Sequence, residues 1–369
     1  MTDEREKARE KALAVLEKKY GDLVMNLRAH AGVQIDVISS GIKTLDAMLG
    51  IGGIPRGRIF QISGNPNVGK STLALLFSAQ VLKNGGSPVY IETESKINPY
   101  WLRSLFGHWG QDYTEMTMIR EQICENAFDI AIRLCPHVDS IVMDSIGGMV
   151  TKADASAPAG DSMPAAMARK LSVVLPQLQA AYWAATPIPA IVFTNQLTTR
   201  FPQYGISLPP HERGGKRLAF LSTYILRLSK GLSKGRGQVV KAKFQKNQLA
   251  LGNWSTECQW TILPGKGIDH VEDTIRAGKA VGVLAGTSHI QWRKDEPGGF
   301  SLPMTKCIKH LTEDPDGAYD EIEAEVDAAL EDIRAQARNG TLMDGPPLDV
   351  AEPDTADDEE EFDATDEGE

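Results

Sequence analysis

The chain of 369 residues has few of the features that mark secreted, metal-binding and membrane proteins. Its four cysteines have no CxxC spacing, so neither a disulfide framework nor a zinc site is expected, and the thiols should be reduced. No apolar run approaches the roughly 18 residues of a membrane helix, and the charged N-terminus has no signal-peptide core behind it. These absences predict a cytoplasmic protein with no membrane partner.

Positive charge is absent from the C-terminal end of the chain. Residues 344–369 hold thirteen Asp or Glu and no Lys or Arg, and without them the formal charge would be +3 instead of −10. Their composition predicts disorder. A slightly basic body with an acidic tail suits a polyanion binder whose tail competes for the same surface, but a merely solubilising tail explains the charge equally well.

The chain does contain a segment that fits the pattern GxxxxGK[ST] at every fixed position, namely Gly64-Asn65-Pro66-Asn67-Val68-Gly69-Lys70-Ser71. An apolar strand is predicted before it, and Thr72 continues into a helix with apolar spacing. In this arrangement backbone N–H groups cradle phosphates, Lys70 reaches the β- and γ-phosphates, and the Ser71 hydroxyl ligates Mg²⁺. The segment predicts a nucleoside triphosphate site, with an ordinary glycine-rich turn as the alternative.

Polar residues close three further predicted strands. Asp144 would hold Mg²⁺ or its water, although an Asp at a strand end is often only a turn former. Glu92 or Glu94 could orient and deprotonate an attacking water, and spacing alone does not choose between them. The pair Asn195-Gln196 could contact the γ-phosphate and pass its presence into the loop that follows.

A helix is predicted to begin at Asn98-Pro99, since Asn is a good N-cap and Pro suits the first helical position. Tyr100 and Trp101 come next. One of them could stack on a nucleotide base, and packing in the core is the competing interpretation.

The pattern from about residue 35 to 264 alternates strands and helices, which is typical of an α/β fold with a mostly parallel sheet covered on both faces. Strands are predicted near 59–63, 88–92, 140–144, 190–195, 223–229, 238–246 and 257–263. Helices are predicted near 71–84, 99–107, 121–135 and 164–184. The segments 151–163 and 197–215 follow strand carboxyl ends, where ligands bind in such sheets, and are predicted to be functional loops.

The two ends of the chain are expected to form smaller units. Residues 4–20 predict an amphipathic helix with Leu13, Leu16 and Tyr20 on one face, which must fold back or dock on a neighbouring copy. Residues 268–338 predict a last unit, with helices near 270–284, 303–311 and 315–336.

Taken together, these segments resemble the bacterial and phage RecA recombinases over nearly the whole chain. The resemblance is carried by Ile38-Ser39-Ser40-Gly41, Leu45-Asp46, the run from Leu49 to Ile59, Ile91-Glu92-Thr93-Glu94, Asn98-Pro99, Asp144-Ser145, Gly160-Asp161-Ser162, Asn195-Gln196, Gly214-Gly215 and Gly265-Lys266-Gly267-Ile268. It implies an α/β RecA-like P-loop ATPase core at 34–266 with DNA-binding loops at 151–163 and 195–215. It also implies an N-terminal oligomerisation arm at 1–33, a C-terminal domain at 267–340 and a disordered acidic tail at 341–369.

The resemblance further implies cofactors, partners and residue roles. ATP and Mg²⁺ would be held by residues 64–72, Asn98, Asp144 and Trp101, the last stacking on adenine. The implied catalytic residues are Glu94 as water-activating base, Lys70, Gln196 as the γ-phosphate sensor and Lys246 acting on the neighbouring copy. The implied partners are single-stranded and double-stranded DNA and further copies in a helical filament, and could include single-strand-binding and mediator proteins.

DNA contacts and copy-to-copy contacts are implied in the same way. The implied DNA-binding residues are Met163, Arg169, Thr198, Thr199, Arg200, Phe201, Arg213, Gly214 and Gly215. Phe220, Val24 and Met25 would lie at the interface between copies. The sequence departs from the bacterial members at Gln248 and Ala219, where a lysine is expected. With Gln248 only one cation should reach the neighbouring phosphate, and Ala219 should weaken another contact between copies.

Two other functions fit the nucleotide motif. The first is a RecA-fold motor that translocates on DNA, and the arm and the C-terminal unit argue against it because both resemble the filament-forming recombinases. The second is a filament scaffold in which ATP is bound but its turnover is vestigial. Gln248 leaves the scaffold open, because one cation fewer should slow hydrolysis.

Overall fold

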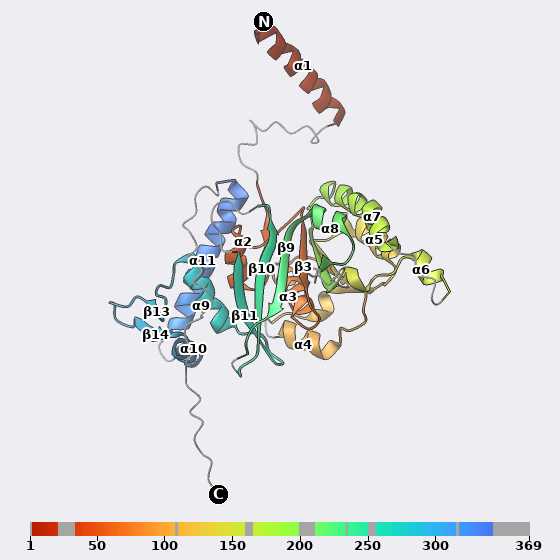
Figure 1. The fold of residues 1–369 in the computed structure, drawn as a ribbon. Coiled ribbons are helices and arrows are strands. Elements are labelled where there is room, and N and C mark those ends of the chain that lie inside the picture. Colours follow the sequence, from red (N-terminus) through yellow and green to blue (C-terminus); the bar gives the residue numbers. More distant parts are fainter. Residues whose placement is uncertain are drawn as a thin grey trace, which may run out of the picture.

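The computed structural model describes residues 2–20, 34–107, 110–158, 165–198, 211–233, 235–249, 256–314 and 317–341. Its centre is a 10-stranded sheet (Figure 1). The parallel strands run in the order β9 (Ser222–Lys230), β3 (Ile59–Gly64), β7 (Ala190–Thr198), β6 (Ser140–Asp144), β4 (Pro88–Glu92) and β5 (Thr117–Arg120). Beyond β9 the sheet continues antiparallel with β10 (Gln238–Asn247), β11 (Glu257–Leu263) and β12 (Gly267–Ile268), and β8 (His211–Glu212) pairs antiparallel with β7.

Helices cover both faces of the parallel part of the sheet, as predicted. On one face Phe60 and Ile62 pack against α3 (Lys70–Lys83) and α4 (Pro99–Gly107). On the other, Ile59 and Phe193 pack with α5 (Cys124–Leu134), α7 (Ala166–Trp183) and α8 (Lys216–Leu221). Strand alternation sends neighbouring side chains to opposite faces, so each buried strand feeds both cores.

The predicted strands and longer helices are confirmed within a few residues, whereas several short elements were not predicted. These include β1 (Val37–Ile38), β2 (Ile54–Pro55), α2 (Lys43–Leu49), α8, β12, the edge strand β5, the 3₁₀ turns Tyr113–Glu115, Cys135–His137 and Ile146–Gly148, and the hairpin β13 (His289–Trp292) with β14 (Phe300–Pro303). The strand β5 lacks a buried face, and only pairing with β4 identifies it.

The prediction that 151–163 and 197–215 are loops is only partly correct. The first contains the short helix α6 (Lys152–Ser156), which Thr151 caps by accepting the Asp154 N–H, and residues 159–164 lie outside the described part. The second begins inside β7 and contains β8, and residues 199–210 lie outside the described part. Local capping and strand pairing therefore extend regular structure into both segments.

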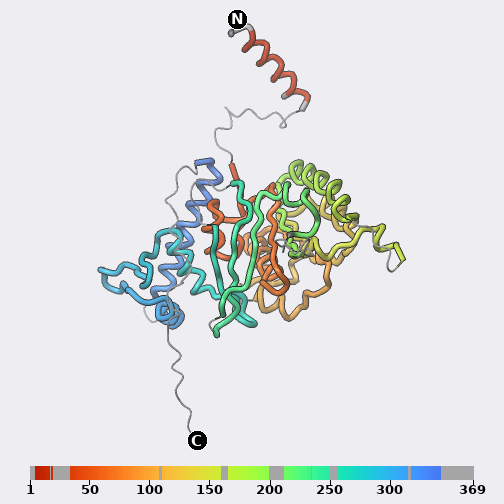
Figure 2. The backbone as a smooth tube through the Cα atoms, in the orientation of Figure 1, coloured from red at the N-terminus to blue at the C-terminus, as the bar shows by residue number. Residues whose placement is uncertain are grey.

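The helix α1 (Thr2–Tyr20) is present as predicted, and Figure 2 shows it apart from the sheet. Leu16 is exposed and Leu13 is half-buried. Docking of this helix on another copy stays a prediction, and the predicted interface residues Val24 and Met25 lie outside the described residues. Among the helices that the structure describes, none has the length and apolarity to cross a membrane.

The C-terminal unit has its own apolar cluster. It is built from α9 (His270–Val281), α10 (Met304–Glu313), α11 (Ala318–Asn339) and the hairpin of β13 and β14. Figure 1 shows it on the side of the sheet away from α5 and α7. The cluster includes Ala47 of α2, and Ala337 of α11 belongs to the cluster under the sheet. The two units thus share apolar packing.

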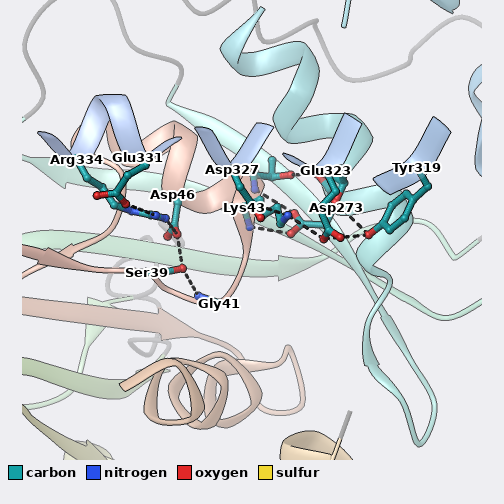
Figure 3. A network of polar contacts seen from close by, with 12 residues as sticks. Ser39, Gly41, Lys43, Asp46, Asp273, Tyr319, Glu323, Asp327, Glu331 and Arg334 are labelled. Carbon is teal, nitrogen blue, oxygen red and sulfur yellow. Dashed lines mark hydrogen bonds and ion pairs between the residues drawn. The ribbon is translucent and has the colours of Figure 1, made fainter. Parts of the chain in front are cut away.

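A polar network joins the same unit to α2 (Figure 3). The carboxylate of Asp273 accepts the backbone N–H groups of Lys43 at 2.7 Å and Thr44 at 3.0 Å, at the start of α2. The Lys43 ammonium pairs with Glu323 at 2.9 Å and Asp327 at 2.6 Å of α11. These contacts tie three helices from distant parts of the chain together.

The second half of the network is centred on Asp46. Its buried carboxylate accepts the Ser40 N–H at 2.8 Å and the Ser39 hydroxyl, and it pairs with Arg334 of α11 at 3.1 Å. Arg334 also donates to the Gly52 carbonyl at 2.8 Å. A buried carboxylate with several donors is stabilised against the cost of desolvation, so this network fixes α11 on the core.

The C-terminal unit is acidic, with eight Lys or Arg and fifteen Asp or Glu between residues 267 and 341. The excess positive charge of the chain therefore lies before residue 267. If the acidic tail competes with a polyanion for a basic surface, that surface belongs to the core rather than to the C-terminal unit.

Burial raises the pKa of Asp273 to about 6, against the opposing hydrogen bonds from Thr44 and Lys43. The folded state then binds more protons than the unfolded state between about pH 4 and pH 6, so this residue makes the protein less stable as the pH rises through that window. We expect Asp273→Asn to remove this component, which amounts to at most about 1.4 kcal/mol per pH unit.

Urea unfolding at a series of pH values measures this effect. Asp327→Asn is the matched control, because Asp327 belongs to the same network but is exposed. Parallel stability curves for wild type and Asp273→Asn would contradict the expectation.

Candidate nucleotide-binding site

The glycine-rich segment joins the carboxyl end of β3 to the first turn of α3, as the sequence predicts. A Cβ on Gly64 would lie 2.6 Å from the carbonyl oxygen of Leu228, so only glycine fits there. Gly69, which precedes α3, has a φ of 96° that favours glycine. The loop thus holds a conformation in which its N–H groups can turn toward an anion at the helix start.

Lys70 folds back over this loop. Its ammonium donates to the carbonyl oxygens of Gly64 at 3.0 Å and Asn65 at 2.7 Å. Burial lowers the pKa of Lys70, while the negative charges of Asp144 and Glu94 act in the opposite direction. The ammonium is therefore held within the loop, and the charges of Asp144 and Glu94 favour its protonated form.

Asp144 lies at the carboxyl end of β6 and is held by both neighbouring strands. One oxygen accepts the Tyr90 hydroxyl of β4 at 2.6 Å, and the other accepts the Thr194 hydroxyl of β7. Burial and the Asp144 carboxylate together raise the pKa of Tyr90 well above its ordinary value. Tyr90 therefore stays a donor. Its role, like that of Thr194, was not predicted, because the strand pattern alone does not say which side chains meet across strands.

The two candidate glutamates have different surroundings. Glu92 is 2% exposed, accepts the Ile97 N–H at 2.7 Å and pairs with Arg120 at 3.2 Å. Glu94 accepts hydrogen bonds from Gln196 at 2.8 Å, from Ser145 and from Lys96. The structure thus places Glu94 beside the ends of β6 and β7, whereas Glu92 braces the turn after β4.

Glu94 is ionised in these surroundings. Burial alone would raise its pKa, but the hydrogen bonds from Lys96, Ser145 and Gln196 outweigh burial and lower the pKa below its ordinary value. A carboxylate with several donors keeps its charge in this way. Lys96 was not predicted, although it lies only two residues after Glu94 in the sequence.

Gln196 connects this carboxylate to the base of the second loop. It pairs in register with Gly64 at the edge of the sheet, and its side chain reaches Glu94. Its carbonyl oxygen accepts the Arg213 N–H at 3.3 Å. The Arg213 guanidinium in turn donates to the Gly147 carbonyl and to Thr198, both at 3.1 Å.

The other predicted DNA-binding residues are only partly described. Arg169 is exposed on α7, and Gly214 and Gly215 have positive φ angles of 93° and 78° before α8. Met163, Thr199, Arg200 and Phe201 lie outside the described residues. The structure therefore brings Thr198, Arg213 and the two glycines to one place and leaves the roles of these residues as predictions.

The start of α4 agrees with its predicted cap, because the Asn98 side chain accepts the Trp101 N–H at 2.9 Å. Trp101 is half-buried and packs against the apolar cluster beneath α3 and α4. Tyr100 is 84% exposed. Packing of Trp101 is thus observed, and its stacking on a base stays a prediction.

A second group of predicted residues lies on α8 and β10. The Phe220 ring is 72% exposed, and the cations of Lys246 and Arg217 lie 6.0 Å and 5.9 Å from its centre. The Lys246 ammonium donates to the carbonyl oxygens of Phe220 at 2.9 Å and Ala219 at 3.2 Å, and burial lowers its pKa. Arg217 was not predicted, since nothing in its local sequence marks it.

Comparison with known proteins identifies the family of this arrangement. The family described as RecA N-terminal domain matches residues 7–269. Protein RecA of Thermus aquaticus is 33% identical over 336 residues, covering 88% of this chain and 95% of that protein. Protein RecA of Deinococcus radiodurans is 30% identical over 355 residues (94% and 92%), and that of Aquifex aeolicus 31% over 333 residues (88% and 92%). The chain belongs to the RecA family, the ATP-dependent recombinases of DNA recombination and repair.

Proposed function

We propose that this chain binds Mg²⁺–ATP at the carboxyl ends of β3, β4, β6 and β7, polymerises on single-stranded DNA and exchanges strands with a homologous duplex. The observation that carries the proposal is the single hydrogen bond of 2.8 Å between Gln196 and Glu94. It joins the edge that carries the phosphate loop to the stem of the second loop, so nucleotide and DNA can influence one another there.

The residues of the phosphate loop fit a triphosphate with its metal. Gly64 and Gly69 allow the loop its conformation, since a Cβ at Gly64 would clash with Leu228 and one at Gly69 with Ile262, and Lys70 supplies the positive charge. The Ser71 hydroxyl and the Asp144 carboxylate are hard oxygen donors of the kind that Mg²⁺ prefers. When bound, the metal neutralises phosphate charge, and the chain's own part is to orient the phosphates and keep Lys70 beside them.

Glu94 is proposed as the base that takes a proton from the attacking water. Its lowered pKa keeps it ionised at neutral pH, and its three donors hold one orientation. Glu92 is not proposed for this step, because it is 2% exposed and braces the turn after β4 through Ile97 and Arg120. A base must lie within hydrogen-bond reach of the water, and the hydrogen bond of Glu94 to Gln196, the proposed γ-phosphate sensor, supports this role.

The DNA-binding surface is proposed at the two loops near 151–163 and 195–215. A strand bound without base reading needs phosphate contacts from a few cations, and Arg169 and Arg213 can supply them. Both residues belong to the core, which carries the excess positive charge of the chain. We further propose that the chain has single-strand-binding and mediator proteins as partners and that it is cytoplasmic.

We propose an interface in which Phe220 and Lys246 of one copy lie against the nucleotide site of the next copy. The exposed Phe220 ring offers apolar area, and Lys246 would stabilise charge on the neighbouring phosphate. Gln248 is exposed and uncharged, which favours slow turnover and leaves the scaffold as a second candidate.

Replacing Lys70 by Ala tests the nucleotide site. We expect the affinity for a fluorescent ATP analogue to fall about 10- to 100-fold, because a charge-assisted contact to phosphate is lost. Negative-stain microscopy with single-stranded DNA and an oligonucleotide strand-exchange assay measure the consequence. Extended filaments and normal exchange by Lys70→Ala with ATP would contradict the proposal, and rings in place of filaments for the wild type would favour the translocating motor.

Replacing Gly148 by Ala tests the role of Glu94 while leaving Glu94 itself in the sequence. The new Cβ would lie 2.6 Å from the Cγ of Glu94 and from the Thr93 hydroxyl oxygen, so Glu94 must shift. We expect phosphate release in the presence of single-stranded DNA to fall about tenfold or more, with ATP affinity retained. Gly147→Ala is the control, because the nearest atoms to its Cβ would be those of Arg213 at 3.2 Å, Gln196 at 3.5 Å and Asn195 at 3.7 Å rather than those of Glu94. Equal rates for both variants would argue against Glu94.

Lys246 and Gln248 test the contact between copies. We expect Lys246→Ala to lower phosphate release on DNA about tenfold while ATP affinity of the isolated chain stays the same, because the cation acts on a neighbour. Gln248→Lys restores a second cation and should raise the rate. A wild type with no DNA-dependent phosphate release would identify the scaffold.

A further inference from the structure

Three side chains form a row across the sheet, one residue before the edge where nucleotide is proposed to bind. Arg227 of β9 pairs in register with Ser63 of β3, and Ser63 pairs in register with Asn195 of β7. Residues that pair in parallel strands point to the same face. Ser63 and Asn195 are fully buried, so the row is covered by another part of the chain.

The cover is the returning stem of the second loop. Glu212 of β8 accepts the Ser63 hydroxyl at 3.3 Å and the Arg227 guanidinium at 2.8 Å, both on the same oxygen. The Asn195 side chain donates to the carbonyl oxygen of Arg213, the residue after Glu212, at 2.7 Å. All three members of the row therefore bind two consecutive residues of the stem.

The ion pair within this row is sheltered from water. The side chains of Arg227 and Glu212 are 30% and 19% exposed. Arg227 Nε is buried without a hydrogen-bond partner among the described residues, so the guanidinium depends on Glu212. Loss of Glu212 would leave a half-buried cation unpaired, which is costly.

The neighbouring residues of β7 divide their contacts between the two faces of the sheet. Asn195 holds the stem, whereas Gln196, which points to the other face, reaches Glu94. Ser63 directly precedes Gly64 of the phosphate loop. A displacement at the end of β3 would thus reach the stem through Ser63 and Glu212 without passing through Gln196.

We propose that Glu212, with Arg227 as its counter-ion, is a positioning residue that couples the nucleotide site to the second loop. This coupling would act in addition to the one that Gln196 makes between the same two sites. It rests on the proposed function in one respect, that the segment 195–215 contacts DNA.

The test measures the affinity of a fluorescent ATP analogue with and without single-stranded DNA, since linkage makes this ratio the coupling between the two ligands. We expect Glu212→Gln and Arg227→Met to reduce the ratio about fivefold to tenfold, with the DNA-free affinity within about twofold of wild type. Exchange of the charges in Glu212→Arg with Arg227→Glu should restore part of the ratio.

A matched control separates coupling from stability. Glu272 and Arg276 of α9 form a pair of the same length, 2.8 Å, with side chains 10% and 24% exposed, far from the stem in the sequence. Glu272→Gln should lower the melting temperature as much as Glu212→Gln does but leave the ratio unchanged. If Arg227→Met does not fold, the nearly isosteric Glu212→Gln decides the question.

Two outcomes distinguish failure of this inference from failure of the proposed function. If the wild-type ratio is one, DNA and nucleotide are not coupled and the proposed function itself is wrong. If Gln196→Ala loses the ratio while Glu212→Gln and Arg227→Met keep it in full, the proposed function stands and Glu212 is only a structural residue.

Discussion

The parallel pairing of β3 with β7, and of β7 with β6 and β4 beyond it, is the constraint on which the site depends. Parallel neighbours end at the same edge, so the phosphate loop, Asp144 and Gln196 meet there although they lie far apart in the sequence. Antiparallel strands would place alternate ends at opposite edges. Parallel strands need long crossover connections, and the helices in these connections cover both faces of the sheet and form the core with it.

Charge at this edge is stabilised by neighbours rather than by solvent. Asp144 takes hydroxyl groups from strands on both sides, and Glu94 takes three donors that keep it ionised. Buried charge is tolerated only when hydrogen bonds replace water, so the donors also fix the geometry. At Asp46 and Asp273, which attach the C-terminal unit to α2 (Figure 3), donors offset the burial only in part, and burial raises both pKa values.

Much of the fold could be predicted, because buried strands and amphipathic helices leave strong periodic patterns. The strands β3, β4, β6, β7, β9, β10 and β11 are of this kind. The edge strand β5 and the helix α6 were missed, since neither is defined by an apolar pattern: pairing with β4 defines the first and a Thr151 cap the second. The strand order could not be predicted either, because strand pairing depends on contacts between segments that are far apart in the sequence.

The sequence by itself determined the phosphate loop, the polar residues that close the strands and the family resemblance, because each is written in consecutive residues. Spacing did not choose between Glu92 and Glu94, and only the resemblance favoured Glu94. The tertiary structure gives the physical reason, since the partner of Glu94, Gln196, lies 102 residues further along the chain. It alone brought Glu212 onto Ser63 and Arg227, and α11 onto α2. Such contacts follow from strand pairing and helix packing between distant segments, and no local pattern encodes them.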